Sequence, residues 1–219
     1  MSGAAGWSGK LGLPLAWPSR AALAAAAACA VVGTALPLWT LSFQSNQYPD
    51  PLVMVIYADH LAGQKTANRD DLVEINGLNH YIGMRPLSEH DFAEFGWLPL
   101  AIVALALLAL RTAALGTLRD AVDAAVLGLL FSGFSLYTFI HRLWEYGHVL
   151  SPEAAIKVAP FTPPFFGRVR IANFWVESYP GFGSLAVMAS VALIVAALAF
   201  GVWRARRGSS SPSAVQAAA

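Results

Sequence analysis

Residues 121–148 read AVDAAVLGLLFSGFSLYTFIHRLWEYGH, an apolar run that ends in a group of ionisable side chains. Crossing the hydrocarbon core of a bilayer takes about 20 helical residues. Residues 121–141 meet that length and carry one acid, Asp123, near their start. The stretch therefore predicts a membrane-spanning helix with a polar end.

The whole chain has the composition of a membrane protein. Of its 219 residues, 57% are hydrophobic and 12% are charged, against about 25% charged residues in soluble domains. A net charge of +1 gives no reason to expect a nucleic-acid partner. The single cysteine, Cys29, excludes an internal disulfide and a multi-cysteine zinc site.

Three further stretches are long and apolar enough to cross a bilayer. The four predicted transmembrane helices are residues 21–43, 97–115, 121–141 and 182–203. Two long polar segments, 44–96 and 142–181, separate them, whereas the connection 111–120 is short. The predicted fold class is an all-α membrane protein with four transmembrane helices and a small β-containing extracytoplasmic segment between the first and second helices.

Basic residues near helix ends set the orientation of a membrane protein. Those on the side of the termini and the short connection are Lys10, Arg20, Arg111, Arg119, Arg204, Arg206 and Arg207. The two long segments carry most of the acids. We therefore expect a cytoplasmic N-terminus at 1–20, a transmembrane domain at 21–203 with 44–96 and 142–181 outside, and a disordered cytoplasmic tail at 204–219.

The start of the first span has some features of a signal peptide, because Ala28-Cys29-Ala30 has the small residues of a cleavage site. The apolar run continues as far as Trp39, which a cleaved signal does not need. This favours an uncleaved anchor, with lipidation at Cys29 as a minor alternative.

The outer segments contain few regular elements by pattern. Residues 52–57 and 72–75 are rich in β-branched residues and flank a turn-forming stretch, so they predict a hairpin of two short strands. The Pro-rich residues 159–167 predict an irregular loop.

All five histidines, His60, His80, His90, His141 and His148, lie in the outer segments or at the outer end of the third span. His80 and Met84 are four residues apart, and on a helix they would share a face. Imidazole with thioether suits Cu(I), whereas imidazole with carboxylate suits Cu(II), zinc or iron. For His60 and His90 the simpler interpretation is a solvated surface residue.

His141, Glu145 and His148 follow each other at steps of four and three, which places them on one helix face. Ionisable groups at the edge of a membrane bundle often mark a site. Two structural alternatives remain open: Glu145 pairs with Arg142, or His148 caps the helix end. Gly147 also offers an end to the helix before His148.

Catalytic signatures are absent from the sequence. It has no nucleophile elbow, phosphate-binding loop, zincin motif or CxxCH haem motif. Histidines occur on one predicted span, which disfavours a haem held between two helices. A non-enzymatic role is therefore the main expectation; a metal-dependent membrane enzyme is a third and weaker hypothesis, and a transporter is weaker still.

Several strings resemble a family of small four-span bacterial membrane proteins often encoded near copper-handling and nitrous oxide reductase maturation genes. They are Tyr48-Pro49, residues 75–84 (INGLNHYIGM) with Pro86, Tyr146-Gly147-His148, Pro152 with residues 155–157, and Asn173-Phe174. The resemblance covers residues 36–203 and implies a bacterial inner-membrane protein. It carries a copper site onto His80, Met84, Glu145 and His148, with no counterpart for His141.

Two function hypotheses follow. The first is a non-enzymatic accessory protein that binds copper on its extracytoplasmic face and supports assembly of a periplasmic copper enzyme. It requires the two outer segments to meet, so that His80 and His148 approach one ion. The alternative is a structural subunit of a larger respiratory or oxidase-type membrane complex, whose histidines are incidental.

Overall fold

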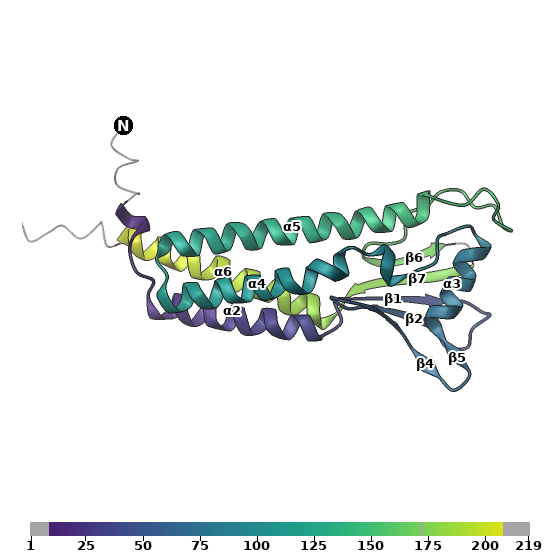
Figure 1. The fold of residues 1–219 in the computed structure, drawn as a ribbon, viewed down its shortest axis with the longest axis horizontal. Coiled ribbons are helices and arrows are strands. Elements are labelled where there is room, and N and C mark those ends of the chain that lie inside the picture. Colours follow the sequence, from purple (N-terminus) through teal and green to yellow (C-terminus); the bar gives the residue numbers. More distant parts are fainter. Residues whose placement is uncertain (1–8, 172, 208–219) are drawn as a thin grey trace, which may run out of the picture. The chain divides into compact units, whose positions relative to one another are not determined.

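The computed structural model describes residues 9–171 and 173–207. Within these residues, four helices are long and apolar enough to cross a membrane. They are α2 (Trp17–Ala35), α4 (Glu94–Leu115), α5 (Leu118–His148) and α6 (Phe182–Arg207), shown in Figure 1. The prediction of four helices that could span a membrane is therefore confirmed in their length and composition.

The chain divides into two compact units. The first, here called the helical unit, takes the described parts of Met1–Val31, Val103–Leu130 and Met188–Ala219. The second, here called the sheet unit, takes Val32–Ile102 and Phe131–Val187. Each unit therefore contains segments of the long helices.

Many of the buried residues of the helical unit have small side chains. Its fully buried positions include Ala26, Ala30, Ala109 and Ala121. The buried Ser19 hydroxyl donates to the Ala197 carbonyl at 2.9 Å, which satisfies a polar group inside an apolar interface. Such small residues let helix backbones approach closely.

A five-stranded antiparallel sheet with the order β3-β2-β1-β7-β6 forms the body of the sheet unit. Its strands are β1 (Trp39–Gln44), β2 (Leu52–Ile56), β3 (Leu61–Gly63), β6 (Gly167–Ile171) and β7 (Phe174–Pro180). Thr40 of β1 pairs with both Val55 of β2 and Tyr179 of β7. The central strand therefore joins the two outer segments.

Three shorter elements complete this unit: the two-stranded ribbon β4 (Lys65–Thr66) and β5 (Arg69–Asp70), helix α3 (Asp71–Tyr81), and the 3-10 turn η1 (Glu89–Asp91). Helix α3 packs on β2 (Figure 1). Ile75 of α3 is buried with Leu41, Leu52 and Met54 of the sheet, forming the apolar core on which this unit folds.

The predicted fold class is wrong. The described chain is a mixed α/β protein, because the sheet draws strands from both outer segments and from the end of the predicted first span. The first helix ends at Ala35, and Pro37 disfavours helix in the residue before it. Residues 39–43, assigned to the span, instead form β1.

The predicted hairpin is half right. Residues 52–56 form β2 as expected, but 72–75 belong to helix α3. The Asp70 side chain accepts a hydrogen bond from the Leu72 backbone N–H, and this N-cap starts a helix. Its cap outweighs the β-branched composition that suggested a strand.

Two other boundaries differ from expectation. Helix α5 continues through Gly147 to His148, seven residues past the predicted end of that span. Residues 204–207, assigned to the disordered tail, belong to α6, and the rest of that predicted tail lies outside the described residues, as does the start of the predicted N-terminal segment. Residues 159–166 are irregular, as the prolines predicted.

Candidate functional site

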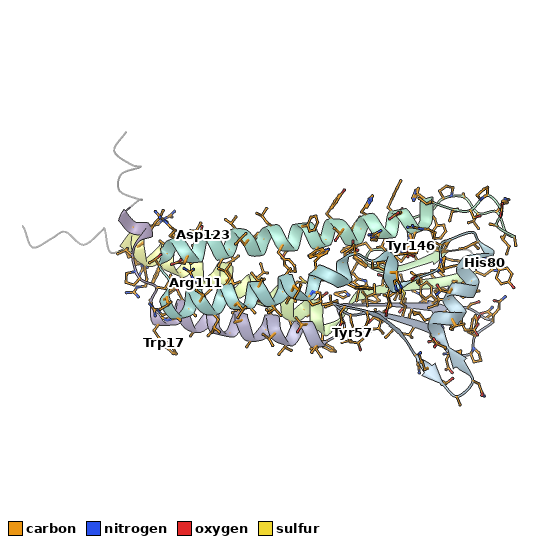
Figure 2. The ribbon with its side chains drawn as sticks, in the orientation of Figure 1. Trp17, Tyr57, His80, Arg111, Asp123 and Tyr146 are labelled. Atoms are coloured by element: carbon orange, nitrogen blue, oxygen red, sulfur yellow. The ribbon has the colours of Figure 1, made fainter. Side chains whose placement is uncertain are left out.

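The structure places the predicted copper ligands in different surroundings. His80 lies on the last turn of α3 with an exposed side chain (Figure 2). Met84 lies three residues beyond the helix, half-buried, with its backbone N–H donating to the Asn79 carbonyl at 2.9 Å. The two residues are therefore not on one helical face.

Glu145 is held by two arginines. One carboxylate oxygen lies 2.9 Å from Arg85 Nη2, and the other lies 3.1 Å from Arg142 Nη1. The structural alternative that paired Glu145 with Arg142 is confirmed. Ion pairs therefore occupy both oxygens of the carboxylate offered as a metal ligand.

His148 belongs to a stacked row of rings on α5. Its Nδ1 lies 2.9 Å from the Trp144 carbonyl oxygen, and its ring stacks on the Trp144 indole at 4.5 Å between centroids. His141 stacks between Trp144 and Tyr137 at 6.2 and 5.9 Å. His141 and His148 thus share a helix face, and their neighbours on it are aromatic.

The other two histidines are also apart from these. His60 stacks on Tyr57 at 4.5 Å, with its Nδ1 2.6 Å from Asp59, and His90 is exposed in η1. Among residues 9–171 and 173–207, no three His, Cys, Asp or Glu side chains are arranged to hold a metal ion. The copper site stays a prediction.

The two outer segments do meet, as the copper hypothesis requires. The Ser151 N–H donates to the Gly83 carbonyl at 2.7 Å, and the Ile156 N–H donates to the Tyr81 carbonyl at 2.9 Å. Gly83 has φ +77°, and a Cβ there would lie 2.9 Å from the Ser151 carbonyl oxygen. A side chain at Gly147 would collide with the Phe161 carbonyl oxygen. Both glycines permit close backbone contact.

These contacts surround a large cavity of about 620 Å³ inside the sheet unit. Pockets that bind small molecules typically measure about 300–1,000 Å³. The cavity lies between the sheet, α3, the start of α4, the later part of α5 and residues 156–163. The apolar residues of its wall include Leu41, Met54, Ile56, Ile75, Met84, Phe92, Trp97, Phe139, Leu143, Val158, Phe161 and Phe174.

The segments that carry the family resemblance line this cavity. Asn79, Met84, Tyr146, Ile156 and Phe174 come from four of the quoted strings, and all contribute to its wall. Of the four predicted copper ligands, Met84 lines the cavity. In the folded chain these strings therefore meet around an apolar cavity, and not around a set of metal ligands.

An ion-pair network forms a polar part of the wall. Arg142 donates from Nε and Nη2 to the two oxygens of Glu94 at 3.2 and 3.3 Å, in bidentate geometry. It also donates to Glu145, which Arg85 contacts from the other side. Two arginines and two glutamates make this network neutral overall.

Tyr146 stands next to this network. Its ring stacks on Phe92 at 5.8 Å, and the Arg85 guanidinium lies 5.3 Å from its ring centroid. The residue is only 5% exposed and lines the cavity, yet its hydroxyl has no hydrogen-bond partner among the described residues. Ser135 also lines the cavity, and its buried hydroxyl likewise has no hydrogen-bond partner among the described residues.

One pattern in the sequence indicates this site, although it contains no metal-ligand motif. Ser135, Thr138, Arg142 and Tyr146 follow each other at steps of three, four and four, so they form one face of α5. A polar stripe of this kind at the end of an apolar span points toward the protein interior. The opposing walls come from distant segments, which the stripe alone does not identify.

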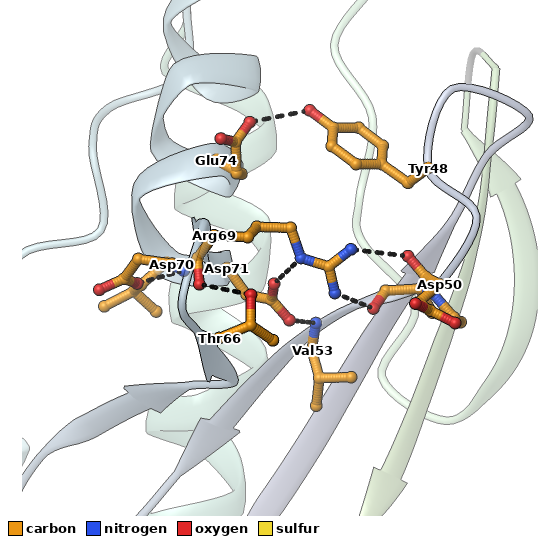
Figure 3. A network of polar contacts seen from close by, with 10 residues as sticks. Tyr48, Asp50, Val53, Thr66, Arg69, Asp70, Asp71 and Glu74 are labelled. Carbon is orange, nitrogen blue, oxygen red and sulfur yellow. Dashed lines mark hydrogen bonds and ion pairs between the residues drawn. The ribbon is translucent and has the colours of Figure 1, made fainter.

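A buried clamp fixes α3 on the sheet beside the cavity (Figure 3). The fully buried Asp71 lies 2.7 Å from Arg69 Nε and accepts from the Val53 N–H at 2.8 Å. Arg69 also donates to the Asp50 and Pro51 carbonyls. Tyr48 donates to Glu74 at 3.0 Å, and burial together with this hydrogen bond raises the pKa of Tyr48.

Comparison of the chain with protein-family models, with curated proteins and with solved structures finds no significant match.

Proposed function

We propose that the protein is a membrane-anchored binding protein whose sheet unit holds a membrane-derived amphiphile. The observation that carries this proposal is the cavity of about 620 Å³, walled mainly by apolar side chains. A polar or charged small molecule would lose its hydration there with few partners in return. An apolar chain suits these walls, and a few polar groups remain to fix its orientation.

Helix lengths support the bilayer as the source of the ligand. A span of about 20 residues counted from the start of α5 at Leu118 ends near Tyr137. Ser135, two residues before this point, and Thr138 and Phe139, just after it, line the cavity. The same count taken back from the end of α4 at Leu115 reaches Gly96, beside the lining residues Trp97 and Leu98. The cavity wall thus begins where hydrocarbon is expected to end.

The charge distribution supports an orientation with both termini in the cytoplasm. Three arginines, Arg204, Arg206 and Arg207, occupy the last turn of α6, and Arg111 and Arg119 flank the short connection between α4 and α5. Basic residues of this kind favour the cytoplasmic side. The sheet unit would then face the outside of a bacterial inner membrane, where a ligand enters from the outer leaflet.

The test is photolabelling with a monoacylglycerol that carries a diazirine on its acyl chain. The protein is reconstituted in nanodiscs, and labelled peptides are identified by mass spectrometry. We expect saturable labelling of cavity-lining peptides that excess unlabelled monoacylglycerol competes away. Val158→Trp fills the cavity from its loop wall and should abolish this labelling.

The matched control is Val169→Trp, which makes the same change at an exposed strand position outside the cavity wall. It should label like the wild type. Saturable labelling that survives Val158→Trp, or no labelling above that of the lipid-exposed helix faces, would overturn the proposal.

Copper binding is retained as a second candidate because Arg85, the residue after Met84, contacts Glu145, and Gly83 bonds to Ser151. These contacts bring the neighbourhoods of the predicted ligands together. In this hypothesis the protein is an accessory to a periplasmic copper protein, as the family resemblance implies. The purified protein should then hold about one copper, which His80→Ala and His148→Ala each remove, and unchanged copper content in both variants would exclude it.

A further inference from the structure

We infer that the cavity selects a neutral amphiphile whose head bears a carbonyl-type hydrogen-bond acceptor, and that the Tyr146 hydroxyl donates to this acceptor. The inference rests on the proposed function and specifies the chemistry of its ligand. Three observations carry it: an unpartnered buried donor, its position along α5, and the charge balance around it.

The first observation is the state of the Tyr146 hydroxyl. The side chain is 95% buried, it lines the cavity, and its oxygen has no partner among the described residues. Leaving a buried hydroxyl unpaired costs free energy, so such groups usually have an explanation. A phenol is protonated at neutral pH and donates one hydrogen bond. A ligand oxygen in the cavity would supply the missing acceptor.

The second observation is the polarity along α5. Ser135 and Tyr146 are eleven residues apart on one helix face, or about 16 Å along the helix axis. The charged Arg142 and the Tyr146 hydroxyl lie at the later end of this face with Leu143 between them, whereas its earlier part, Ser135, Thr138 and Phe139, carries no charge. Near Ser135 the wall is completed by Trp97, which lies 5.5 Å from Phe134 between ring centroids. A ligand head therefore fits at Tyr146, with its chain directed toward Ser135.

The third observation is the charge of the polar wall. The charges of the two arginines next to Tyr146 are balanced by carboxylates: Arg142 pairs with Glu94 and Glu145, and Arg85 pairs with Glu145 through Nη2, although its buried Nε has no hydrogen-bond partner among the described residues. Asp91 is a further acid close enough to act on the Tyr146 hydroxyl electrostatically. An anionic head would need a cation that this wall has committed elsewhere. A neutral ester or ketone needs only a donor.

The experiment compares three diazirine probes of equal chain length on the full chain in nanodiscs. One is the monoacylglycerol, the second replaces its ester by an ether, and the third is the free fatty acid at pH 8. For the wild type we expect half-maximal labelling of the cavity peptides at a concentration about tenfold lower for the ester than for the ether, as one hydrogen bond provides. The fatty acid should label no better than the ether.

Tyr146→Phe removes the hydroxyl and keeps the ring that stacks on Phe92. It should raise the half-maximal concentration of the ester to that of the ether and leave the ether unchanged. Tyr137→Phe, which makes the same change at a 63% exposed position on α5, should behave like the wild type. Because the ester-to-ether ratio is measured within one sample, partial loss of folded protein does not alter it.

The outcomes separate the two proposals. Competable labelling that Val158→Trp abolishes, combined with an unchanged ester-to-ether ratio in Tyr146→Phe, would overturn the inference and leave the proposed function standing. A fatty acid that labels better than the ester would overturn the neutral head. Labelling that Val158→Trp does not affect would overturn the proposed function itself.

Discussion

The helical unit and the sheet unit bury their residues in different ways. In the helical unit many buried residues are small, such as Ala26 and Ala30, beside a few large ones such as Leu23 and Ile194, and the buried Ser19 bonds to a backbone carbonyl. In the sheet unit large side chains line a partly open space of about 620 Å³. Small residues let helix backbones pack closely with little space between them. The large side chains of the sheet unit come from five different segments and leave a cavity between them.

The two units also differ in the buried polar groups that they contain and in the partners of these groups. Ser19 and Thr112, both buried in the helical unit, donate to backbone carbonyls of helices. The sheet unit fully buries a charged group, Asp71, in its pair with Arg69, and it also holds the partly buried network around Arg142. Charged pairs cost desolvation and need exact partners, so they fix geometry around the cavity. This contrast agrees with the function proposed above, in which the helical unit anchors the chain and the sheet unit binds the ligand.

The largest effect is expected where the sheet unit buries charge. Asp71→Ala leaves Arg69 and the Val53 N–H without their partner and should lower the free energy of unfolding by about 3–5 kcal/mol. The measurement is denaturant unfolding in detergent, followed by the near-UV signal of the sheet unit. The control is Lys65→Ala, which removes a pair 2.9 Å long whose lysine is 73% exposed and should cost at most about 1 kcal/mol. Equal effects would contradict a buried clamp.

The close contact between the outer segments gives the next effect. Gly83→Ala forces a side chain onto a backbone with φ +77° and against Ser151, so we expect a loss of about 1–3 kcal/mol. Gly77 lies in α3 of the same string and has open space around it. Gly77→Ala should therefore stabilise the helix by about 0.5–1 kcal/mol. Opposite signs in unfolding experiments would confirm that Gly83 serves docking.

The two units should respond oppositely to added volume. Ala109→Leu overfills the helical unit and should cost about 1–3 kcal/mol, whereas Ala104→Leu at an exposed position of the same helix should be neutral. Ser135→Leu adds volume next to the cavity and removes an unpartnered hydroxyl. It should leave stability unchanged or raise it by about 1 kcal/mol. Destabilisation by Ser135→Leu equal to that by Ala109→Leu would contradict the hollow.

The long helices could be predicted from the sequence, whereas most of the sheet could not. Spans depend on local composition, so all four helices were predicted, with boundaries decided by Pro37 and by the continuation through Gly147. The sheet was missed because β1 pairs with β7 more than 130 residues away, and no local pattern names a partner that distant. The sequence also contains the N-cap of α3, because Asp70 precedes residues 72–75, but the β-branched composition of these residues favours a strand.

The site was missed for a related physical reason. Histidines, methionine and glutamate were considered by their ligand chemistry, while Glu145 satisfies two arginines and His148 stacks on Trp144. The cavity is a space left between side chains of several distant segments, so no single sequence motif marks it. The polar stripe on α5 is the feature of the local sequence that indicates the cavity. Whether the Tyr146 hydroxyl has a partner depends on the other walls of the cavity, and the sequence alone does not show where those walls lie.

The smallest expected effect concerns Tyr48, which joins the sheet unit's first loop to α3 (Figure 3). Burial and the hydrogen bond to Glu74 raise its pKa in the folded state, so folding favours the protonated phenol. Its contribution to stability is therefore complete below the unfolded pKa of about 10 and is lost as the pH rises through the folded pKa. Tyr48→Phe should cost about 1 kcal/mol at pH 7, and the difference from wild type should shrink above pH 10. A constant difference from pH 7 to pH 11 in unfolding experiments would show that deprotonation of the Tyr48 hydroxyl is not linked to unfolding.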